Sequence, residues 1–179
     1  MTTCALTGHR PAHFFFQDKE QHPDCVALKE SMREQISQLA ARGVTTFLTG
    51  MALGVETWGA EIVLELKEKD PRLKLVAVLP CETQANKWTE RQRERYFDIL
   101  ARCDEAVYVR RRYRASCMLE RNRYLVEHSE ILLAVYDGAP GSGTAYTVGY
   151  AQQKSREVIL LLAQNCNSSI DIEEILVRE

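Results

Sequence analysis

Short apolar runs alternate with longer amphipathic stretches along most of the chain. The runs are rich in β-branched residues and have the length of strands, whereas the stretches between them carry apolar residues at helical spacing. Such an alternation is typical of a parallel sheet covered by helices, so the pattern predicts an α/β fold. The expected strands are 3–7, 45–49, 73–79, 105–109, 130–136 and 158–162, and the expected helices are 24–41, 55–68, 88–101, 115–128 and 144–154.

Local signals define some of the boundaries and the number of domains. Gly43 follows the first expected helix as a C′ glycine, and Pro71 cannot continue the second. The sequence contains no internal repeat, low-complexity stretch or linker, so a single domain over residues 1–164 is expected. Residues 165–179 are expected to be an extension packed on that domain, first polar and then able to form a short helix or strand.

The alternation also predicts a topology. Right-handed crossovers would place helices on both faces of a mostly parallel sheet, which gives three layers, and the favoured strand order is 3-2-1-4-5-6. In such sheets ligands bind outside the carboxyl ends of the strands, where the winding reverses. We therefore expect the functional residues in the loops that follow the strands.

Composition and charge exclude several classes of protein. The chain has 179 residues, of which 45% are hydrophobic and 27% charged, as in an ordinary globular domain. Its 23 Lys and Arg nearly balance 25 Asp and Glu, so no global field would draw it to nucleic acid or to an anionic membrane. Neither a secretory leader nor an apolar run of membrane-spanning length is recognisable, so we expect a cytoplasmic protein with no membrane partner.

Cysteine and histidine spacing gives little support for a metal. The six cysteines are far apart and include no Cys-x-x-Cys pair, so reduced thiols are expected. His9 and His13 are close in sequence, but Pro11 between them argues against one helical face presenting both as ligands. No metal site is therefore predicted.

The most informative stretch is a glycine turn after the fifth expected strand. It runs from Asp137 through Gly141, Ser142, Gly143 and Thr144 into the last expected helix. A buried strand, a glycine turn and a helix N-terminus in that order favour a phosphate-sized anion, because glycines allow close approach and free N–H groups point at it. The spacing is neither that of the P-loop nor the full dinucleotide fingerprint.

The loop after the first strand places a titratable imidazole and a fixed cation at the expected reversal point. Gly8 permits a tight turn there, and His9 and Arg10 follow it. We interpret these residues as part of an anion site. The alternative is a surface turn that carries charges without a ligand.

The loop after the second strand has the same character. Gly50 and Gly54 precede a helix and leave backbone N–H groups open, and Glu56 in the first helical turn could accept hydrogen bonds from ribose hydroxyls. The alternative is structural, because an acid in the first turn also offsets the helix dipole.

Three further candidates lie after the third and fourth strands. Gln84 and Trp88 could rim a base-binding pocket. The cluster Arg110–Arg114, four arginines around Tyr113, could bind nucleic acid or polyphosphate, or could simply be a solvated loop. Arg121 would point toward the crevice if its helix presents the N-terminal half there.

These motifs together resemble known families. Residues 118–122, 128–130 and the glycine turn are similar to the signature of the Lonely Guy (LOG) phosphoribohydrolases, which release a cytokinin base from its riboside monophosphate. The whole chain resembles the DUF1273, or YpsA-like, group of the SLOG superfamily, through Gly8, Gly50, residues 54–58, Pro80, Gln84, Trp88 and the glycine turn. The resemblance implies a Rossmann-like domain related to LOG and DprA proteins.

The resemblance also assigns roles and exposes one departure. Arg121 occupies the place of the LOG arginine that acts on the ribose phosphate, Asn122 follows it in the same motif as a candidate ligand-binding residue, and the glycine turn matches the phosphate-binding turn. The hydrolases carry a glutamate two or three residues after the threonine, where this chain has Tyr146 and Thr147. Neither supplies a carboxylate, unless Glu56 takes that role.

Three functions follow from these observations. The first is binding of a nucleotide-derived ligand such as ADP-ribose, NAD or a nucleoside monophosphate, as a sensor or regulatory protein with no cofactor beyond that nucleotide. The second is LOG-like N-glycosidase activity, for which Arg121 and Glu56 are the candidate catalytic residues. The third is DprA-like binding of single-stranded DNA through Arg110–Arg114. The resemblance also implies a possible homodimer.

Overall fold

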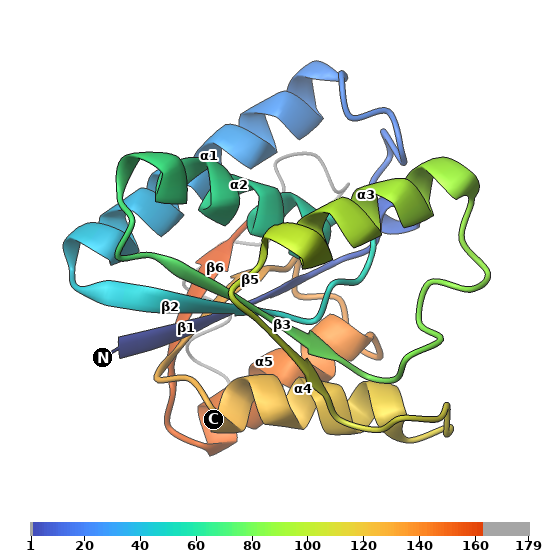
Figure 1. Ribbon diagram of the computed structural model, residues 1–179. Helices are drawn as coiled ribbons and strands as arrows, with labels where there is room; N and C mark the ends of the chain where they lie inside the picture. The colour runs from blue at the N-terminus through green and yellow to red at the C-terminus, as the bar shows by residue number, and fades with distance from the viewer. Residues whose placement is uncertain (1, 163–179) are drawn as a thin grey trace.

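A computed structural model describes residues 2–162 as a six-stranded sheet with helices on both faces (Figure 1). All neighbouring strands are parallel. The strands are β1 (Thr2–Gly8), β2 (Val44–Thr49), β3 (Lys74–Leu79), β4 (Glu105–Tyr108), β5 (Ile131–Val135) and β6 (Glu157–Leu161). The helices are α1 (Pro23–Ala41), α2 (Val55–Lys69), α3 (Glu90–Arg102), α4 (Cys117–Glu127) and α5 (Gly143–Gln153), with a short 3-10 helix η1 (Pro11–His13).

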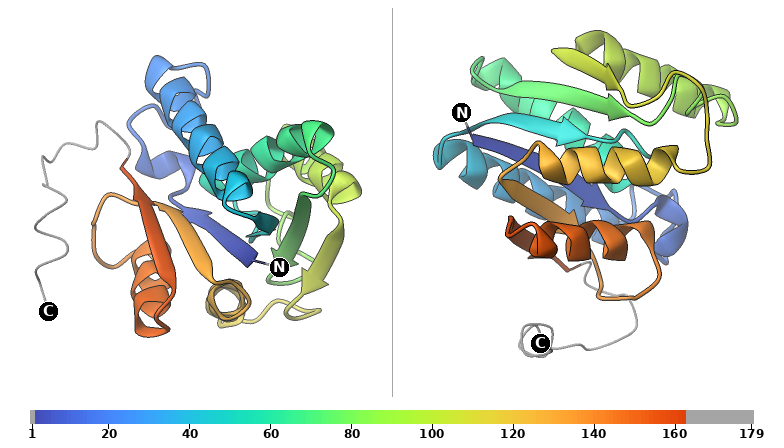
Figure 2. Two further views of the ribbon diagram at one scale, coloured as in Figure 1. Left: turned by 90° about the vertical axis from the view of Figure 1, so that its left-hand side faces the viewer. Right: turned by 90° about the horizontal axis from the view of Figure 1, so that it is seen from below.

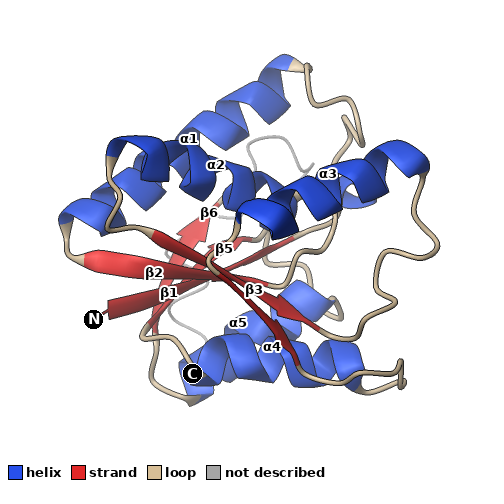
Figure 3. Ribbon diagram, viewed as in Figure 1, coloured by secondary structure: helices blue, strands red, loops and turns tan. Residues whose placement is uncertain are grey.

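The α/β class and the three layers are confirmed. Helices α1, α2 and α3 cover one face of the sheet, and α4 and α5 cover the other (Figures 1 and 3). The view from below in Figure 2 shows α4 and α5 side by side across the sheet.

The central strands are buried on both faces, which explains their continuous apolar sequences. Leu6 of β1 and Phe47 of β2 belong to the core beneath α1, α2 and α3, whereas their neighbours Ala5 and Leu48 belong to the core beneath α4 and α5. Because successive strand residues point to opposite faces, one apolar run supplies both cores.

The strand order corrects the predicted order in the place of one strand. The sheet runs β4-β3-β2-β1-β5-β6, so β4 lies at the edge beside β3 and not between β1 and β5. Glu105, Ala106 and Tyr108 of β4 are exposed, which suits an edge, whereas every residue of β5 is buried and needs a neighbour on each side. The winding therefore reverses between β1 and β5, where Gly8 pairs with Val135.

Helix ends follow local chemistry. A capping box of Thr89 and Gln92 begins α3, and Gly43 after α1 has the positive φ of 97° that a C′ glycine adopts. The five cysteines within the described residues are free thiols, as expected. Cys166 and the expected extension over residues 165–179 lie outside the described part of the chain.

None of the helices in the described residues is both long enough and apolar enough to span a membrane.

Candidate functional site

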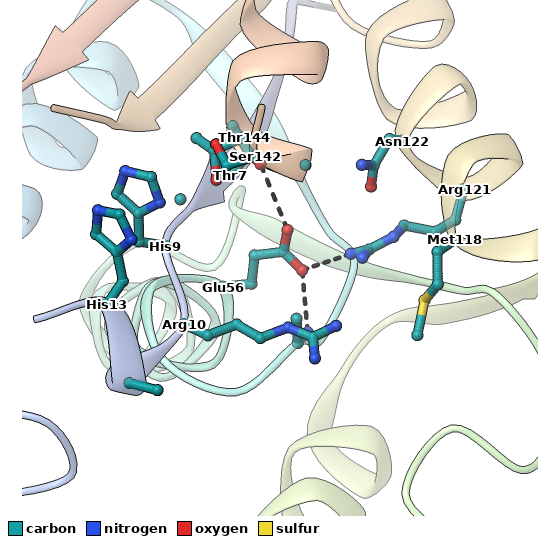
Figure 4. Close-up of a pocket in the computed structure, with 14 residues that line it drawn as sticks. Thr7, His9, Arg10, His13, Glu56, Met118, Arg121, Asn122, Ser142 and Thr144 are labelled. Atoms are coloured by element: carbon teal, nitrogen blue, oxygen red, sulfur yellow. Dashed lines mark hydrogen bonds and ion pairs between the residues drawn. The ribbon is translucent and has the colours of Figure 1, made fainter. Parts of the chain in front are cut away.

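A pocket of about 530 Å³ lies at the carboxyl ends of β1 and β5, where the winding reverses (Figure 4). Small-molecule sites usually have volumes of roughly 300 to 1,000 Å³. Its walls come from the end of β1, the η1 turn, the start of α2, the first half of α4 and the N-terminus of α5. The structure brings most of the predicted site residues into this lining: Gly8, His9, Arg10, Glu56, Arg121, Asn122, Ser142, Gly143 and Thr144.

The other four predicted residues, Gly50, Gly54, Asp137 and Gly141, lie outside the lining. Two of them, Gly50 and Gly54, are required sterically. A Cβ atom at Gly50 would fall 1.4 Å from Nη1 of Arg121. Gly54 has a φ of 91°, and a Cβ there would lie 2.9 Å from the His9 carbonyl oxygen. Asp137 bonds to His9, and Gly141 adopts a φ of 79° in the exposed turn.

A buried ion pair between Glu56 and Arg121 forms the floor of the pocket. Arg121 Nη1 donates to Glu56 Oε2 at 2.5 Å, and both side chains are only 5% exposed. The same oxygen accepts from the Ala52 amide at 3.0 Å, while within residues 2–162 Glu56 Oε1 has only a long hydrogen bond of 3.5 Å from Thr7 Oγ1. Oε1 therefore retains capacity to accept from a ligand.

Threonines hold the loop that positions Glu56. Thr49 Oγ1 donates to the Glu56 carbonyl at 3.0 Å and accepts from the Met51 amide at 3.3 Å. Thr57 Oγ1 donates to the Ala52 carbonyl at 2.7 Å. These hydroxyls satisfy three backbone groups of the loop and so help to position the Glu56 carboxylate.

Arg121 has a donor without an acceptor. Its Nε atom is buried and makes no hydrogen bond within the described residues. An unmet buried donor costs about 1 to 3 kcal/mol or more, so such groups usually have a functional reason. Arg121 also lines the pocket, although its Nε itself is shielded from solvent.

Arg10 adds an exposed cation. Its side chain extends toward the Glu56 and Arg121 pair (Figure 4), and its guanidinium forms no ion pair with any residue in the described range. Because Glu56 offsets the charge of Arg121, Arg10 gives this wall of the pocket a net positive charge.

The N-terminus of α5 supplies backbone donors. Ser142 is its N-cap and accepts from the Ala145 amide at 3.0 Å. The amides of Gly143 and Thr144, which precede the first intrahelical hydrogen bond, remain available to an anion in the pocket. The Thr144 hydroxyl lies in the same wall.

His9, His13 and Asp137 form a cluster at the edge of the pocket. His9 Nε2 lies 2.9 Å from Asp137 Oδ1, and His13 Nε2 lies 2.7 Å from Asp137 Oδ2. The two imidazole rings stack with centroids 3.6 Å apart. As expected from the sequence, no one helical face presents both histidines, because His9 follows β1 and His13 ends the 3-10 turn that Pro11 opens. The sequence did not indicate that the two rings meet across this turn.

Burial and hydrogen bonding shift the pKa values of this cluster. Burial lowers the pKa of His9, although the Asp137 carboxylate acts in the opposite direction. Burial alone would raise the pKa of Asp137, but hydrogen bonds from His13, the Ala139 amide and His9 hold it far below its ordinary value. At neutral pH Asp137 is therefore a carboxylate and His9 is neutral.

The residues at the positions of the hydrolase glutamate, Tyr146 and Thr147, lie outside the pocket lining. The Tyr146 hydroxyl accepts from Arg123 Nε at 2.7 Å on the outer side of α5, and Thr147 Oγ1 donates to the Gly143 carbonyl at 2.8 Å. Glu56 is the carboxylate that lines the pocket.

Two other groups proposed from the sequence also lie outside this pocket. Gln84 Nε2 donates to the Gly50 carbonyl at 3.0 Å and so supports the loop below Arg121, while Trp88 packs edge-on against Tyr96. The arginine cluster 110–114 is exposed, with Arg110 paired to Glu120.

Some lining residues were not predicted from the sequence. Met118 lies one helical turn before Arg121 and Asn122, and this i, i+3, i+4 spacing is the signal that could have found it. Thr7 is the residue before Gly8 in the strand, and Ala52 lies within the glycine loop. Local spacing could not find His13, since its place depends on the η1 turn.

Comparisons with known proteins identify the family. Residues 4–163 match the model of the YspA SLOG family. A UPF0398 protein of Halalkalibacterium halodurans is 36% identical over 149 residues, covering 82% of this chain and 78% of the relative. UPF0398 proteins of Bacillus thuringiensis strain Al Hakam and Bacillus cereus strain AH187 are each 31% identical over 156 residues, covering 86% of this chain and 84% of the relative. The chain therefore belongs to the YpsA family of SLOG proteins.

Proposed function

We propose that this protein binds a nucleotide-derived ligand, of the ADP-ribose, NAD or nucleoside monophosphate type, in the pocket between β1 and β5. The observation that carries the proposal is the buried guanidinium of Arg121, whose one side-chain hydrogen bond within the described residues goes to Glu56, in the same pocket lining as the available amides of Gly143 and Thr144. Two independent sets of donors thus converge on one space and favour an anionic group there. Membership of the SLOG family, a nucleotide-related Rossmann-like group, supports the same class of ligand.

The carboxylate of Glu56 narrows the class of ligand. A bare inorganic anion would be repelled by a carboxylate in the same pocket, whereas a ligand that carries hydroxyl groups beside its phosphate can donate to Glu56 Oε1. Ribose phosphates have both groups. Met118 offers a half-buried thioether in the lining, which suits contact with a base.

The best arrangement places the phosphate against the N-terminus of α5 and the ribose over Glu56. Arg10 then lies at the open side and can pair with a second phosphate, which favours a pyrophosphate such as that of ADP-ribose. Such a site would suit a sensor or regulatory protein that recognises a metabolite.

N-glycosidase activity is the second candidate, and the presence of Glu56 in the pocket is the observation that favours it. A carboxylate beside a bound ribose could stabilise positive charge at the glycosidic carbon. Incubation with nucleoside monophosphates would then yield free base and ribose 5-phosphate, and Glu56→Gln would abolish the release. Tight binding without release of base would favour recognition alone.

Isothermal titration with ADP-ribose, NAD, AMP and adenosine tests the proposal, with Gly143→Asp as the disruptive variant. Gly143 is exposed, and a Cβ there would come no closer than 3.9 Å to Asn122 Nδ2, so the fold accommodates the change. The new carboxylate would lie at the anion site and repel phosphate. Gly149→Asp is the matched control, since it places the same charge on α5 with no atom within 4 Å of its Cβ.

We expect the wild type and Gly149→Asp to bind a phosphate-bearing ligand more tightly than adenosine. Gly143→Asp should weaken that binding by more than about tenfold, a loss of roughly 1.4 kcal/mol. The absence of heat at millimolar concentrations of every nucleotide would contradict the proposal, as would equal affinities for the two variants.

A further inference from the structure

The cluster of His9, His13 and Asp137 has a second chemical capacity besides its internal hydrogen bonds. Each residue offers one ligand atom, and the three atoms lie within 4.8 Å of one another. The donors come from three places that the fold brings together: the residue after β1, the end of η1 and the second residue after β5. Parallel pairing of β1 with β5 sets this juxtaposition.

The donor set indicates the class of ion. Two imidazole nitrogens with one carboxylate oxygen suit borderline divalent transition metals such as Zn²⁺, which binds nitrogen at about 2.0 to 2.1 Å. Mg²⁺ and Ca²⁺ prefer sites made of oxygen atoms alone. A mixed site of this kind therefore selects against the abundant hard cations.

Ligation must replace the hydrogen bonds within the cluster. His9 Nε2 and His13 Nε2 now bond to the two oxygens of Asp137, so each imidazole must carry its proton on Nδ1 and present the Nε2 lone pair to the ion.

We propose that His9, His13 and Asp137 bind one divalent transition-metal ion, with Zn²⁺ as the best fit, at the edge of the pocket. The proposal goes beyond ligand recognition and needs no nucleotide. His9 is the fixed ligand, with a side chain 3% exposed, whereas that of His13 is 34% exposed.

Ligation requires a small movement of one ring. The stacked rings now direct their Nε2 atoms at different oxygens of one carboxylate, with planes 14° apart, so they cannot both point at one ion. His13 lies at the end of the η1 turn and is the more exposed ring, and its tilt would bring both nitrogens to a common point. His9 and Asp137 can stay in place.

Three protein ligands leave at least one coordination position open. Because His9 and His13 both line the pocket, that position faces the space in which the anion donors converge. A phosphate oxygen or a water would complete the coordination there. The ion would then add positive charge on the wall opposite Arg121.

Titration of chelator-treated protein with Zn²⁺ alone tests the site. We expect one ion per chain in the wild type, with affinity lower by more than about tenfold in His13→Ala and in Asp137→Asn. His22→Ala is the matched control, because His22 is another partly exposed histidine beside an acid, at the start of α1 and away from the pocket lining. It should bind as the wild type does.

Substitution with Co²⁺ identifies the ligands independently. The free thiols could capture metal, but thiolate ligation produces intense near-ultraviolet bands that histidine and carboxylate ligands do not. We expect a Co²⁺ spectrum without those bands. The proposal is overturned if the wild type takes up no Zn²⁺, if His13→Ala binds as tightly as His22→Ala, or if the thiolate bands appear. Since no nucleotide is present, these outcomes leave the proposed nucleotide site untouched.

Discussion

Two arginine–glutamate clusters in this protein differ in how completely their hydrogen bonds are satisfied. Arg95 on α3 donates from Nε and Nη2 to Glu61 at 2.6 Å each, and from Nη1 and Nη2 to Glu20 at 2.5 and 3.0 Å. Arg121 on α4 donates from Nη1 to Glu56, and its Nε has no acceptor in the described structure. The Arg95 side chain is 31% exposed and the Arg121 side chain 5%.

The difference separates a structural contact from a binding site. Arg95 uses four of its five guanidinium N–H donors to join α3, α2 and the segment before α1, so at most one is left for a ligand. Arg121 is more deeply buried and yet less satisfied, the reverse of what stability alone would favour. Arg121 lines the pocket and Arg95 does not, so we attribute the difference to ligand binding.

Removal of one partner of the buried Glu56–Arg121 ion pair should give the largest loss of stability. Glu56→Ala leaves the Arg121 charge unpaired and the Ala52 amide without its acceptor. We expect the free energy of unfolding in urea to fall by about 3 to 5 kcal/mol. Glu61→Ala, which removes a partly exposed partner of Arg95, should cost only about 1 kcal/mol.

The double variant Glu56→Leu/Arg121→Met sharpens the first prediction. It removes both charges and should recover most of the lost stability, because well-packed apolar side chains often replace buried ion pairs without cost. Equal losses for Glu56→Ala and Glu61→Ala would show that the two clusters do not differ in the way proposed.

A methyl group at Gly50 should produce an intermediate effect. The Cβ of Gly50→Ala would fall 1.4 Å from Arg121 Nη1, so the guanidinium must move out of the pocket floor. We expect a loss of about 1 to 3 kcal/mol in stability and a clear loss of nucleotide affinity, measured by urea unfolding and calorimetry. Gly149→Ala has open space around its Cβ and lies within α5, so it should gain about 0.5 to 1 kcal/mol. Unchanged binding in Gly50→Ala would remove Arg121 from the site.

Acid titration of Glu20, which belongs to the Arg95 cluster, should give the smallest effect on stability. Burial raises the pKa of Glu20, but hydrogen bonds from Arg95 and Lys29 outweigh it and lower the pKa from 4.5 to about 2. A depressed pKa means that the stabilisation is present above pH 4.5 and is lost as the pH falls toward 2. Melting temperatures of the wild type and Glu20→Gln should therefore differ above pH 4.5 and converge toward pH 2, and parallel curves would exclude this role.

Much of this fold could be read from the sequence, because the signals were local. Apolar runs with helical stretches between them indicated each strand and helix, and glycines with polar residues at strand ends indicated the loops of the pocket. Gly8, Glu56 and Gly143 were found in this way, and all three line it. The lack of a carboxylate at Tyr146 and Thr147, where the LOG hydrolases carry a glutamate, is also visible in the sequence.

The rest depended on contacts between distant segments. The order 3-2-1-4-5-6 would have placed β4 between β1 and β5 and kept His9 away from Asp137, which lies 128 positions later in the chain. β4 lies at the edge instead, where its weak apolar pattern leaves Glu105, Ala106 and Tyr108 exposed. Likewise, the pairing of Glu56 with Arg121 requires α2 and α4, from opposite faces of the sheet, to approach at one end of it.

The amide NMR spectrum of the protein during titration with ADP-ribose tests the central claim most directly. If the phosphate lies against the N-terminus of α5, the largest shifts should occur at the amides of Gly143 and Thr144, with smaller ones near Gly8 and Arg10, and Gly143→Asp should abolish them. An absence of shifts at Gly143 and Thr144, or shifts confined to Arg110–Arg114, would contradict the account.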